Sequence, residues 1–254
     1  MVPASKIKFV KSLQTEKFRK LHGLFPVEGP TMVKELLKSD FTVDELFAVR
    51  SWFEEAKDEI NSFGGNVYEV TEKELNRLSG LKTPNKVLAT AKIPENKISG
   101  KIFNHLLIAL DEIADPGNLG TIIRIADWFG IQNIICSPHT AGLFNPKVVR
   151  ATMGSLFRVR LFYVDLGDVF IKYGKNLPIL GATLTGENIY KARLPEKAVV
   201  VIGNEARGIS PGIRSHLTGE ISIPLFGQAT ESLNAAVATG IICSEFLRRR
   251  SVHT

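Results

Sequence analysis

The spacing of apolar residues changes several times along this chain, and each change marks a different kind of element. Near the N-terminus Val10 and Leu13, and then Val33 and Leu36, recur at helical spacing, which predicts two helices within residues 6–40. Residues 23–29 lie between them as a short extended piece bounded by glycines. The same pattern predicts strands at 46–49, 67–70 and 87–91, a helix at 52–63, and a helix from the Thr71–Glu74 capping box to about Leu78. Alternating strands and helices indicate a small α/β unit.

The second half contains longer apolar runs. Residues 105–110 and 198–202 are almost continuously apolar, which is typical of parallel strands buried on both faces. Helices are predicted from Leu119 to Phe129, from Pro146, and from a cap at Ser232 to about Arg250. Further strands are predicted at 133–136, 159–164, 178–183 and 220–225. This half is therefore predicted to be a doubly wound α/β domain with helices on both faces of its sheet.

A polar stretch separates the two halves. Residues 92–103 contain one proline, one glycine and several charged or amide side chains. We predict a first domain at 1–95, a linker at 96–103 and a second domain at 104–254.

Composition narrows the class of protein. Hydrophobic residues make up 44% and charged residues 23% of the 254, as in soluble globular proteins, and no apolar run is long enough to span a bilayer. The N-terminus lacks the apolar core of a signal peptide, so we expect a cytoplasmic protein. Cys136 and Cys243 stand in apolar surroundings and are predicted to be reduced core residues.

The basic residues are unevenly distributed. The net charge is +6, and residues 1–23 hold six basic side chains against the single acid Glu16. Three consecutive arginines, Arg248, Arg249 and Arg250, precede the last four residues of the chain. Such runs are often solvated helix faces, but they are also suited to binding the phosphates of a nucleic acid.

Several common catalytic motifs are missing from the sequence. Residues 115–120 supply Gly-x-x-Gly at a helix start, which is an incomplete dinucleotide fingerprint, so a Rossmann-type dehydrogenase is a remote alternative. There is no P-loop and no Cys-x-x-Cys, and the five histidines are scattered, so no metal site is expected.

Three segments carry the strongest signal. Residues 118–126 read NLGTIIRIA, residues 202–208 read IGNEARG, and residues 221–225 read ISIPL, followed by SLNAAVATG at 232–240. Each joins a strand end, a turn of small residues and a polar side chain to a helix start. In this order and spacing they resemble the three motifs of the SpoU (TrmH-type) RNA ribose 2'-O-methyltransferases.

The resemblance implies a SPOUT fold with a C-terminal trefoil knot, S-adenosylmethionine as cofactor and a homodimer with sites at its interface. It covers residues 104–250 strongly, and residues 14–29 look like the start of that family's L30e-like RNA substrate-binding domain. The last helix, with Leu233, Val237, Ile241, Ile242, Phe246 and Leu247, has more apolar surface than one face usually needs, which suits such an interface.

Residue roles follow from the match to the family's motifs. The catalytic residues implied are Asn118, Arg124, Glu205, Ser232 and Asn234. The cofactor-binding residues implied are Thr183, Leu184, Gly186, Ile202, Gly203, Ile223, Pro224, Leu225 and Leu233. For RNA binding we single out the basic N-terminal side chains Lys6, Lys8, Lys11, Lys17, Arg19 and Lys20.

The permanent positive charge of Arg124 limits the catalytic roles that it can have. An arginine is always protonated, so Arg124 is a poor general base. It is better suited to holding a phosphate and stabilising negative charge on the attacking ribose oxygen.

The expected function is methyl transfer to a ribose 2'-hydroxyl of structured RNA, most readily ribosomal RNA. Two alternatives stay open at this point: a tRNA 2'-O-methyltransferase, and a non-catalytic RNA-binding protein on the same fold. The joint presence of all five catalytic residues argues against the second.

Overall fold

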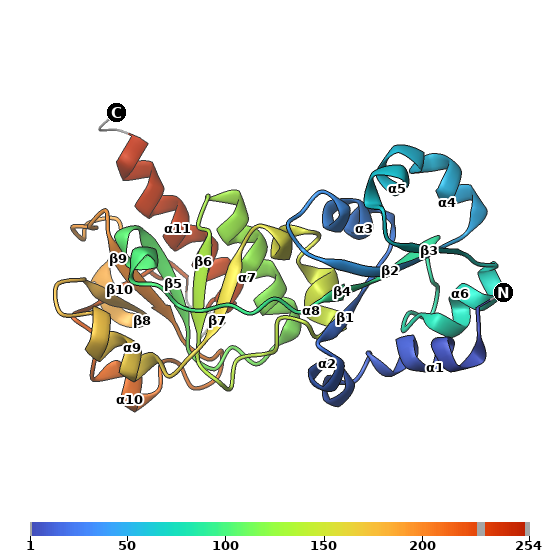
Figure 1. Ribbon diagram of the computed structural model, residues 1–254. Helices are drawn as coiled ribbons and strands as arrows, with labels where there is room; N and C mark the ends of the chain where they lie inside the picture. Colours follow the sequence, from blue (N-terminus) through green and yellow to red (C-terminus); the bar gives the residue numbers. More distant parts are fainter. Residues whose placement is uncertain (1, 228–231, 252–254) are drawn as a thin grey trace. The chain divides into compact units, whose positions relative to one another are not determined.

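A computed structural model describes residues 2–227 and 232–251, and divides them into two compact units. The first comprises residues 1–95 together with 143–158, and the second comprises 96–142 and 159–254. Figure 1 labels the helices and strands along the chain. We describe each unit by itself.

The first unit is built on a four-stranded sheet of order β1-β4-β2-β3. The strands are β1 (Leu24–Glu28), β2 (Val43–Ala48), β3 (Asn66–Glu69) and β4 (Val87–Lys92). β4 pairs antiparallel with β1 and β2, whereas β2 and β3 are parallel. The sheet is therefore mixed. Its helices are α1 (Ala4–Ser12), α2 (Glu16–His22), α3 (Pro30–Leu37), α4 (Arg50–Glu55), α5 (Lys57–Phe63), α6 (Glu72–Leu78) and α8 (Pro146–Ala151).

The predicted elements of this unit are present, but two predicted helices are each divided. The helix expected before residue 23 is broken into α1 and α2 at Thr15, whose backbone is extended, and Arg19 donates to the carbonyl oxygens of Leu13 and Gln14 at the turn between them. The helix expected at 52–63 is interrupted at Ala56, whose ψ of 33° is not helical. The capping box at Thr71 and Glu74 is confirmed, with both reciprocal hydrogen bonds formed.

The second unit contains a six-stranded, all-parallel sheet of order β10-β8-β9-β5-β6-β7. The strands are β5 (Leu106–Leu110), β6 (Asn133–Cys136), β7 (Arg160–Tyr163), β8 (Ile179–Asn188), β9 (Ala198–Ile202) and β10 (Gly219–Ser222). The helices are α7 (Pro116–Trp128), α9 (Leu166–Tyr173), α10 (Pro211–Arg214) and α11 (Ala235–Ser251). The pattern did not predict α9 or the single-turn α10.

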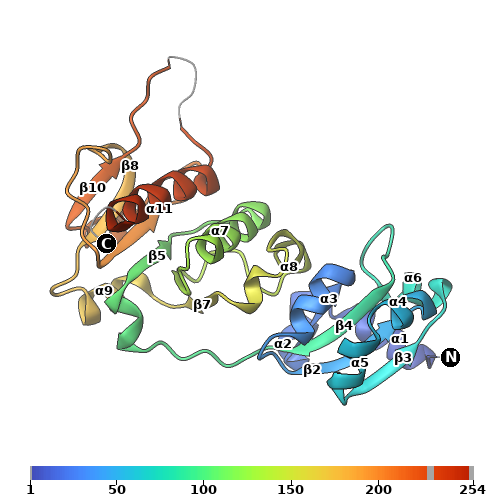
Figure 2. The same ribbon diagram turned by 90° about the horizontal axis from the view of Figure 1, so that it is seen from above.

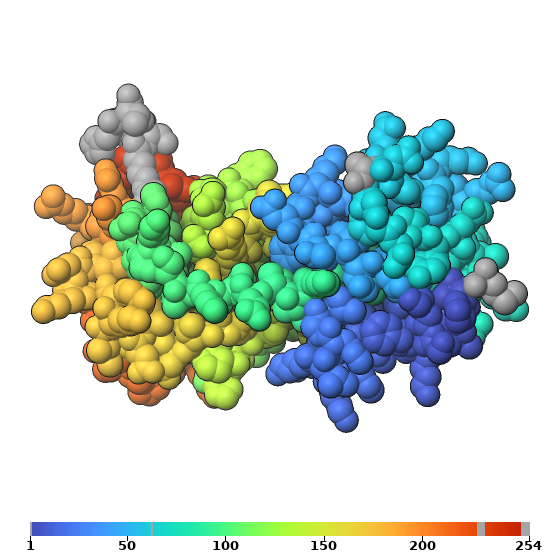
Figure 3. Space-filling model, viewed as in Figure 1, coloured from blue at the N-terminus to red at the C-terminus, as the bar shows by residue number. Residues whose placement is uncertain are grey.

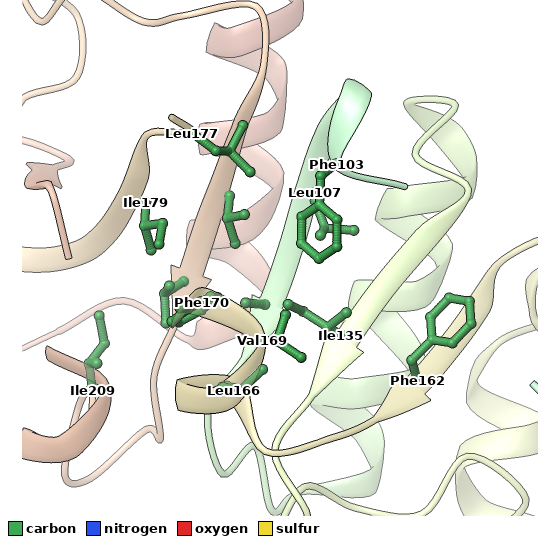
Figure 4. Packing of buried hydrophobic residues seen from close by; sticks show 13 residues of the cluster. Phe103, Leu107, Ile135, Phe162, Leu166, Val169, Phe170, Leu177, Ile179 and Ile209 are labelled. Atoms are coloured by element: carbon green, nitrogen blue, oxygen red, sulfur yellow. The ribbon is translucent and has the colours of Figure 1, made fainter. Parts of the chain in front are cut away.

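Helices cover both faces of this sheet, as predicted. Residues Leu166, Val169 and Phe170 of α9 pack against Leu107 and Val199 in one buried cluster, shown in Figure 4. Because side chains alternate along a strand, the neighbouring buried residues of β5 and β9 point to the opposite face. Figure 2 shows α7 and α11 together on that face, and Ile125 of α7 approaches Gly240 of α11.

The polar stretch between the halves is not entirely without structure. Residues Gly100–Asn104 form a 3-10 helix, and Phe103 in it is buried in the cluster beneath α9. Ile98 and Ile102 pack against the same cluster. Residues 96–103, predicted as a linker, therefore contribute to the core of the second unit.

Two predicted boundaries near the C-terminus are wrong. The strand expected at 220–225 ends at Ser222, since Pro224 has no N–H to donate to a neighbouring strand. The strand expected at 178–183 instead continues to Asn188, although its pairing with β10 passes from Gly181 directly to Glu187. The strand β8 is thus longer than predicted and has a bulge where it pairs with β10.

Candidate active site

Three loops leave the carboxyl ends of parallel strands of the second unit and carry the polar residues that the motifs single out. The first loop leads from β5 to α7, the second follows β9, and the third leads from β10 to α11. Carboxyl ends of parallel strands lie at one edge of a sheet, which is where open α/β sheets bind ligands.

Asn118 connects the three loops. Its Nδ2 donates to Oε1 of Glu205 at 2.6 Å, and its Oδ1 accepts from Nδ2 of Asn234 at 2.8 Å. The side-chain amide therefore uses both ends, one for each of the other two loops. Glu205 lies 87 positions and Asn234 lies 116 positions from Asn118 in the sequence, yet the two hydrogen bonds join the three side chains in one line.

Capping interactions fix both ends of this line. The backbone N–H of Asn118 donates to the N-cap residue Asp115 at 2.8 Å, and Pro116 occupies the first turn of α7. Asn234 accepts from the backbone N–H groups of Ala236 and Val237, so it caps α11. The prediction that Ser232 caps this helix is wrong, because the helix begins at Ala235.

The turn that carries Glu205 is closed by its own backbone. Asn204 and Gly208 exchange two backbone hydrogen bonds, and Gly208 has a φ of +69°. A Cβ at Gly203 would lie 2.3 Å from the backbone carbon of Gly208. The close approach that requires glycine here is therefore between two parts of the same turn.

Two further side chains hold this turn, and the motif comparison did not single them out. Asn204 accepts from the N–H groups of Ala206 and Arg207 and donates to the carbonyl oxygen of Glu112 at 2.8 Å. Arg207 pairs with the Glu112 carboxylate at 2.6 Å. Glu112 follows β5 and has a φ of +58°, which is strained for a residue with a side chain. Asparagine in a tight turn often hydrogen-bonds the backbone two residues on. Asn204 is therefore the sequence feature from which this turn-holding role could have been predicted.

Arg124 is not part of the bonded line. Its side chain is exposed on α7 and makes no hydrogen bond or ion pair within the part of the chain that the structure describes. Six residues along a helix correspond to about 9 Å of rise and a different face, which separates Arg124 from Asn118. Ser232 is also exposed, without a bond to another described side chain. The structure therefore brings together three of the five predicted catalytic residues.

The predicted cofactor-binding residues fall into a polar group and an apolar group. In the polar group, Thr183 donates to Glu220 at 3.0 Å, and hydrogen bonds from Arg214 and then Thr183 lower the pKa of that carboxyl group. Gly186 approaches β10 so closely that a Cβ would lie 2.5 Å from the backbone nitrogen of Ile221. Its carbonyl oxygen accepts from Ser222 at 2.7 Å.

The apolar group contains side chains that a soluble protein normally covers. Leu184, Leu225 and Leu233 are 72%, 68% and 47% exposed, whereas Ile223 and Pro224 are half-buried and Ile202 is buried. Residues 223–227 make no backbone hydrogen bond with the rest of the described chain. Exposed leucines beside free backbone groups suit a ligand with an aromatic base, which needs apolar contact and a few directed hydrogen bonds.

The predicted RNA-binding residues divide differently. Lys8, Lys11 and Lys17 are exposed, and Lys20 is exposed but pairs with Glu16 at 2.6 Å. Lys6 is paired with the buried carboxylate of Glu45, and that hydrogen bond raises the pKa of the lysine. Arg19 is only 6% exposed and its guanidinium bonds two carbonyl oxygens. The fold thus already engages the guanidinium of Arg19, and its contact with RNA stays a prediction.

The C-terminal arginines also have internal partners. Arg248 and Arg249 both bond Glu245, and Arg249 donates in addition to the carbonyl oxygens of Ile189, Tyr190 and Ala192. The side chain of Arg250 lies outside the described residues. This run is not the free basic surface that its composition suggested.

Both cysteines are buried and free, as predicted. Burial raises the pKa of the Cys136 thiol, and raises that of Cys243 to about 12, so neither forms a thiolate at neutral pH. No described helix is long and apolar enough to cross a membrane. Within the described residues, no three histidine, cysteine or acidic side chains gather as metal ligands would.

Comparison with known proteins identifies the family. The family model for the SpoU rRNA methylases matches residues 105–244, which is more than half of the chain. The chain belongs to the SpoU rRNA methylase family. The model for the MRM3-like substrate-binding domain matches residues 4–89. The sequence prediction of an RNA methyltransferase with an N-terminal substrate-binding domain is thereby confirmed.

Individual relatives extend over nearly the whole chain. It is 30% identical to the 23S rRNA (guanosine(2553)-2'-O)-methyltransferase RlmP of Bacillus subtilis, across 93% of this chain and 94% of that protein. A TrmH-family protein from Porphyromonas gingivalis is 36% identical and superimposes with a TM-score of 0.86, covering 98% of this chain and 99% of the other. The SpoU methyltransferase AviRb of Streptomyces viridochromogenes, solved with the cofactor AdoMet, is 26% identical, with the same TM-score and coverage.

Proposed function

We propose that this protein transfers a methyl group from S-adenosylmethionine to a ribose 2'-hydroxyl of 23S ribosomal RNA. The observation that carries the proposal is the hydrogen-bonded line from Glu205 through Asn118 to Asn234, because it unites the three family motifs in one site. The coverage of RlmP, a 23S rRNA 2'-O-methyltransferase, supports ribosomal RNA as the substrate.

The protein's task in this reaction is mainly alignment. S-adenosylmethionine supplies a methyl group on a sulfonium cation, whose charge is neutralised when the methyl leaves. The hydrogen-bonded line Glu205–Asn118–Asn234 orients the ribose. Arg124 holds the adjacent phosphate and stabilises negative charge on the 2'-oxygen. Ser232, exposed at the approach to α11, contributes a hydroxyl at the same site. The 2'-oxygen forms its bond to the methyl carbon as the sulfur–carbon bond breaks, and the hydroxyl proton passes to solvent water rather than to Arg124, since arginine stays protonated.

The cofactor contacts come from three places. Leu184, Leu225 and Leu233 supply apolar walls for the adenosine, and the free backbone of residues 223–225 supplies hydrogen bonds to the base. Thr183, Gly186, Ile202 and Gly203 line the remainder. The AdoMet complex of AviRb supports the choice of cofactor. The family likeness also supports a C-terminal trefoil knot around this site.

A homodimer completes the site in this proposal. Val237 and Leu233 at the start of α11 remain 51% and 47% exposed, whereas Ile242 and Phe246 on the same helix are buried within their own unit. The exposed pair supports a two-fold interface. Asn118 already bonds Glu205 and Asn234 of its own chain, so Arg124 is the residue that reaches the partner's cofactor site.

Domain roles follow from the family matches. Residues 1–95 bind the RNA, residues 96–103 connect, and residues 104–254 bind the cofactor and carry out the transfer. The two free, buried cysteines support a reducing compartment, and the proposal places the protein in the cytoplasm.

The test uses purified protein, labelled S-adenosylmethionine and total RNA from cells that lack the gene. Label in 23S rRNA at one ribose, mapped by resistance of the adjacent bond to alkali, is the expected result. An Asn118→Ala variant should bind S-adenosylmethionine but give little label. Label in tRNA instead would replace the substrate assignment, and no label in any RNA with the cofactor bound would contradict the activity.

A further inference from the structure

Two aromatic rings form an exposed pair on the first unit. The rings of Phe18 and His22 are nearly parallel, with an interplanar angle of 6° and centroids 6.2 Å apart. His22 also packs edge-on against Phe9 of α1, with centroids at 4.9 Å. Phe18 is 36% exposed and the neighbouring Leu21 is 67% exposed. The pair therefore presents ring surface to solvent.

The local fold holds these rings in a fixed arrangement. Phe18 and His22 are four residues apart on α2, so they share one face of the helix. The buried Arg19 bonds the end of α1 through the carbonyl oxygens of Leu13 and Gln14, which fixes the corner between the two helices. Gly23, with a φ of +62°, ends α2 immediately after His22. The rings thus occupy a short, well-anchored helix.

The exposed charges on α1 and α2, the helices that carry these rings, are mostly positive. Lys8, Lys11 and Lys17 are exposed on α1 and α2, and the only acid in residues 2–22, Glu16, is paired with Lys20. Figure 3 shows side chains of this dark blue segment on the visible surface. Exposed aromatic rings among lysines are the combination that binds unpaired nucleotides, because bases stack on the rings and phosphates contact the cations.

We propose that Phe18 and His22 form a stacking platform for an unpaired base of the RNA, with Lys8, Lys11 and Lys17 contacting its phosphates. This rests on the proposed function only in taking RNA as the partner. It adds that the first unit binds a single-stranded or looped element. A duplex keeps its bases stacked on one another and has no free base for the platform.

The experiment measures binding of the full-length protein to two probes. One is a short oligouridylate with a central 2-aminopurine, whose fluorescence falls when the base stacks. The other is the same strand annealed to its complement. Wild-type protein should bind the single strand more tightly and quench it. Phe18→Ala should weaken single-strand binding roughly 5- to 100-fold, the range for one stacked base, with duplex binding unchanged.

Two further variants keep the result interpretable. Leu21→Ala, an exposed apolar change on the same helix, should leave both affinities unchanged. Phe18→Leu preserves apolar volume but removes the ring, so it should reproduce the single-strand defect even if Phe18→Ala proves unstable. No quenching by wild type, equal losses on both probes, or a similar loss in Leu21→Ala would overturn the platform.

Failure of the platform is distinguishable from failure of the proposed activity. Stacking of the probe needs no cofactor, so the wild-type protein should quench it equally with and without S-adenosylmethionine. An enzyme that methylates 23S rRNA while Phe18→Ala binds the probe normally would overturn only the platform.

Discussion

The two units use their charged and polar residues in opposite ways. In the first unit, six basic side chains lie close together in sequence, yet Lys6 and Arg19 are engaged by the fold itself. In the second, Asn118, Glu205 and Asn234 lie far apart in sequence and converge in one hydrogen-bonded line. Position at the end of a parallel strand is therefore a better guide to a site than local abundance of charge.

The physical reason lies in the two kinds of sheet. An all-parallel sheet buries both faces and places every strand's carboxyl end at one edge, so its polar loops gather there. The mixed sheet of the first unit has no such common edge. Its basic side chains lie on helices, where the local packing decides whether each charge is exposed or bonded internally.

The largest effect is expected at Arg124, an exposed charge on α7 of the second unit. Arg124→Ala should reduce methyl transfer by on the order of 10²–10³, or about 3–4 kcal/mol, the loss of one preorganised donor to a developing oxyanion. Affinity for S-adenosylmethionine should be nearly unchanged. Single-turnover rates and cofactor titration measure the two quantities.

A matched control is Arg160→Ala, which removes an exposed arginine from β7 of the same unit. Normal turnover in Arg124→Ala, or an equal loss in Arg160→Ala, would show that Arg124 has no special part in the reaction.

Glu245 tests whether the C-terminal arginine run is structural. It is 5% exposed, and hydrogen bonds from Arg248 and then Arg249 lower its pKa to about 2. Glu245→Gln should destabilise the protein by about 1–3 kcal/mol at neutral pH, the usual range for hydrogen bonds to a charged group. Chemical denaturation of both proteins gives this difference.

The difference should depend on pH with a definite sign. A carboxyl group whose pKa is lower in the folded state stabilises fully above its unfolded pKa of about 4.3 and progressively less as the pH falls toward 2. The wild-type advantage over Glu245→Gln should therefore be constant from pH 7 to about 5 and shrink below that. An advantage that does not change with acid would contradict the pairing.

The line through Asn118 predicts coupling rather than independent effects. In a double-mutant cycle, Asn118→Ala and Glu205→Gln should interact by about 1–2 kcal/mol in transition-state free energy, as contacting residues do. Asn118→Ala combined with Asp168→Asn, an exposed change in the first turn of α9, should be additive. Additivity of Asn118 with Glu205 would mean that their 2.6 Å contact does not contribute to the reaction.

The smallest effects are expected for the lysines of the first unit, where exposed lysines should behave differently from the internally paired Lys6. Replacing Lys8, Lys11 and Lys17 together by glutamine should weaken RNA binding and reduce the slope of log affinity against log salt by about 2–3. Lys6→Gln should leave that slope unchanged and lower stability, because Glu45 then loses its partner. Equal salt slopes for the two variants would show that exposure in this structure does not predict phosphate contact.

The sequence alone determined the family, the alternation of elements and most strand positions. Periodicity located the buried strands because burial on both faces requires continuous apolar runs, as in β9. Local capping chemistry located the helix that begins after Thr71, since both partners lie within one turn. The three motifs identified Asn118, Glu205 and Asn234, and the family match supports their common site.

Only the tertiary structure decided which of these side chains meet and which charges are free. Arg19 and Lys17 are alike in a sequence pattern, but one is buried against carbonyl oxygens and the other is exposed. Asn234, not Ser232, caps α11, and Asn204 holds the Glu205 turn through Glu112, which is 92 residues away. Such contacts depend on how distant strand ends are brought together by packing, and no local pattern of residues encodes that distance.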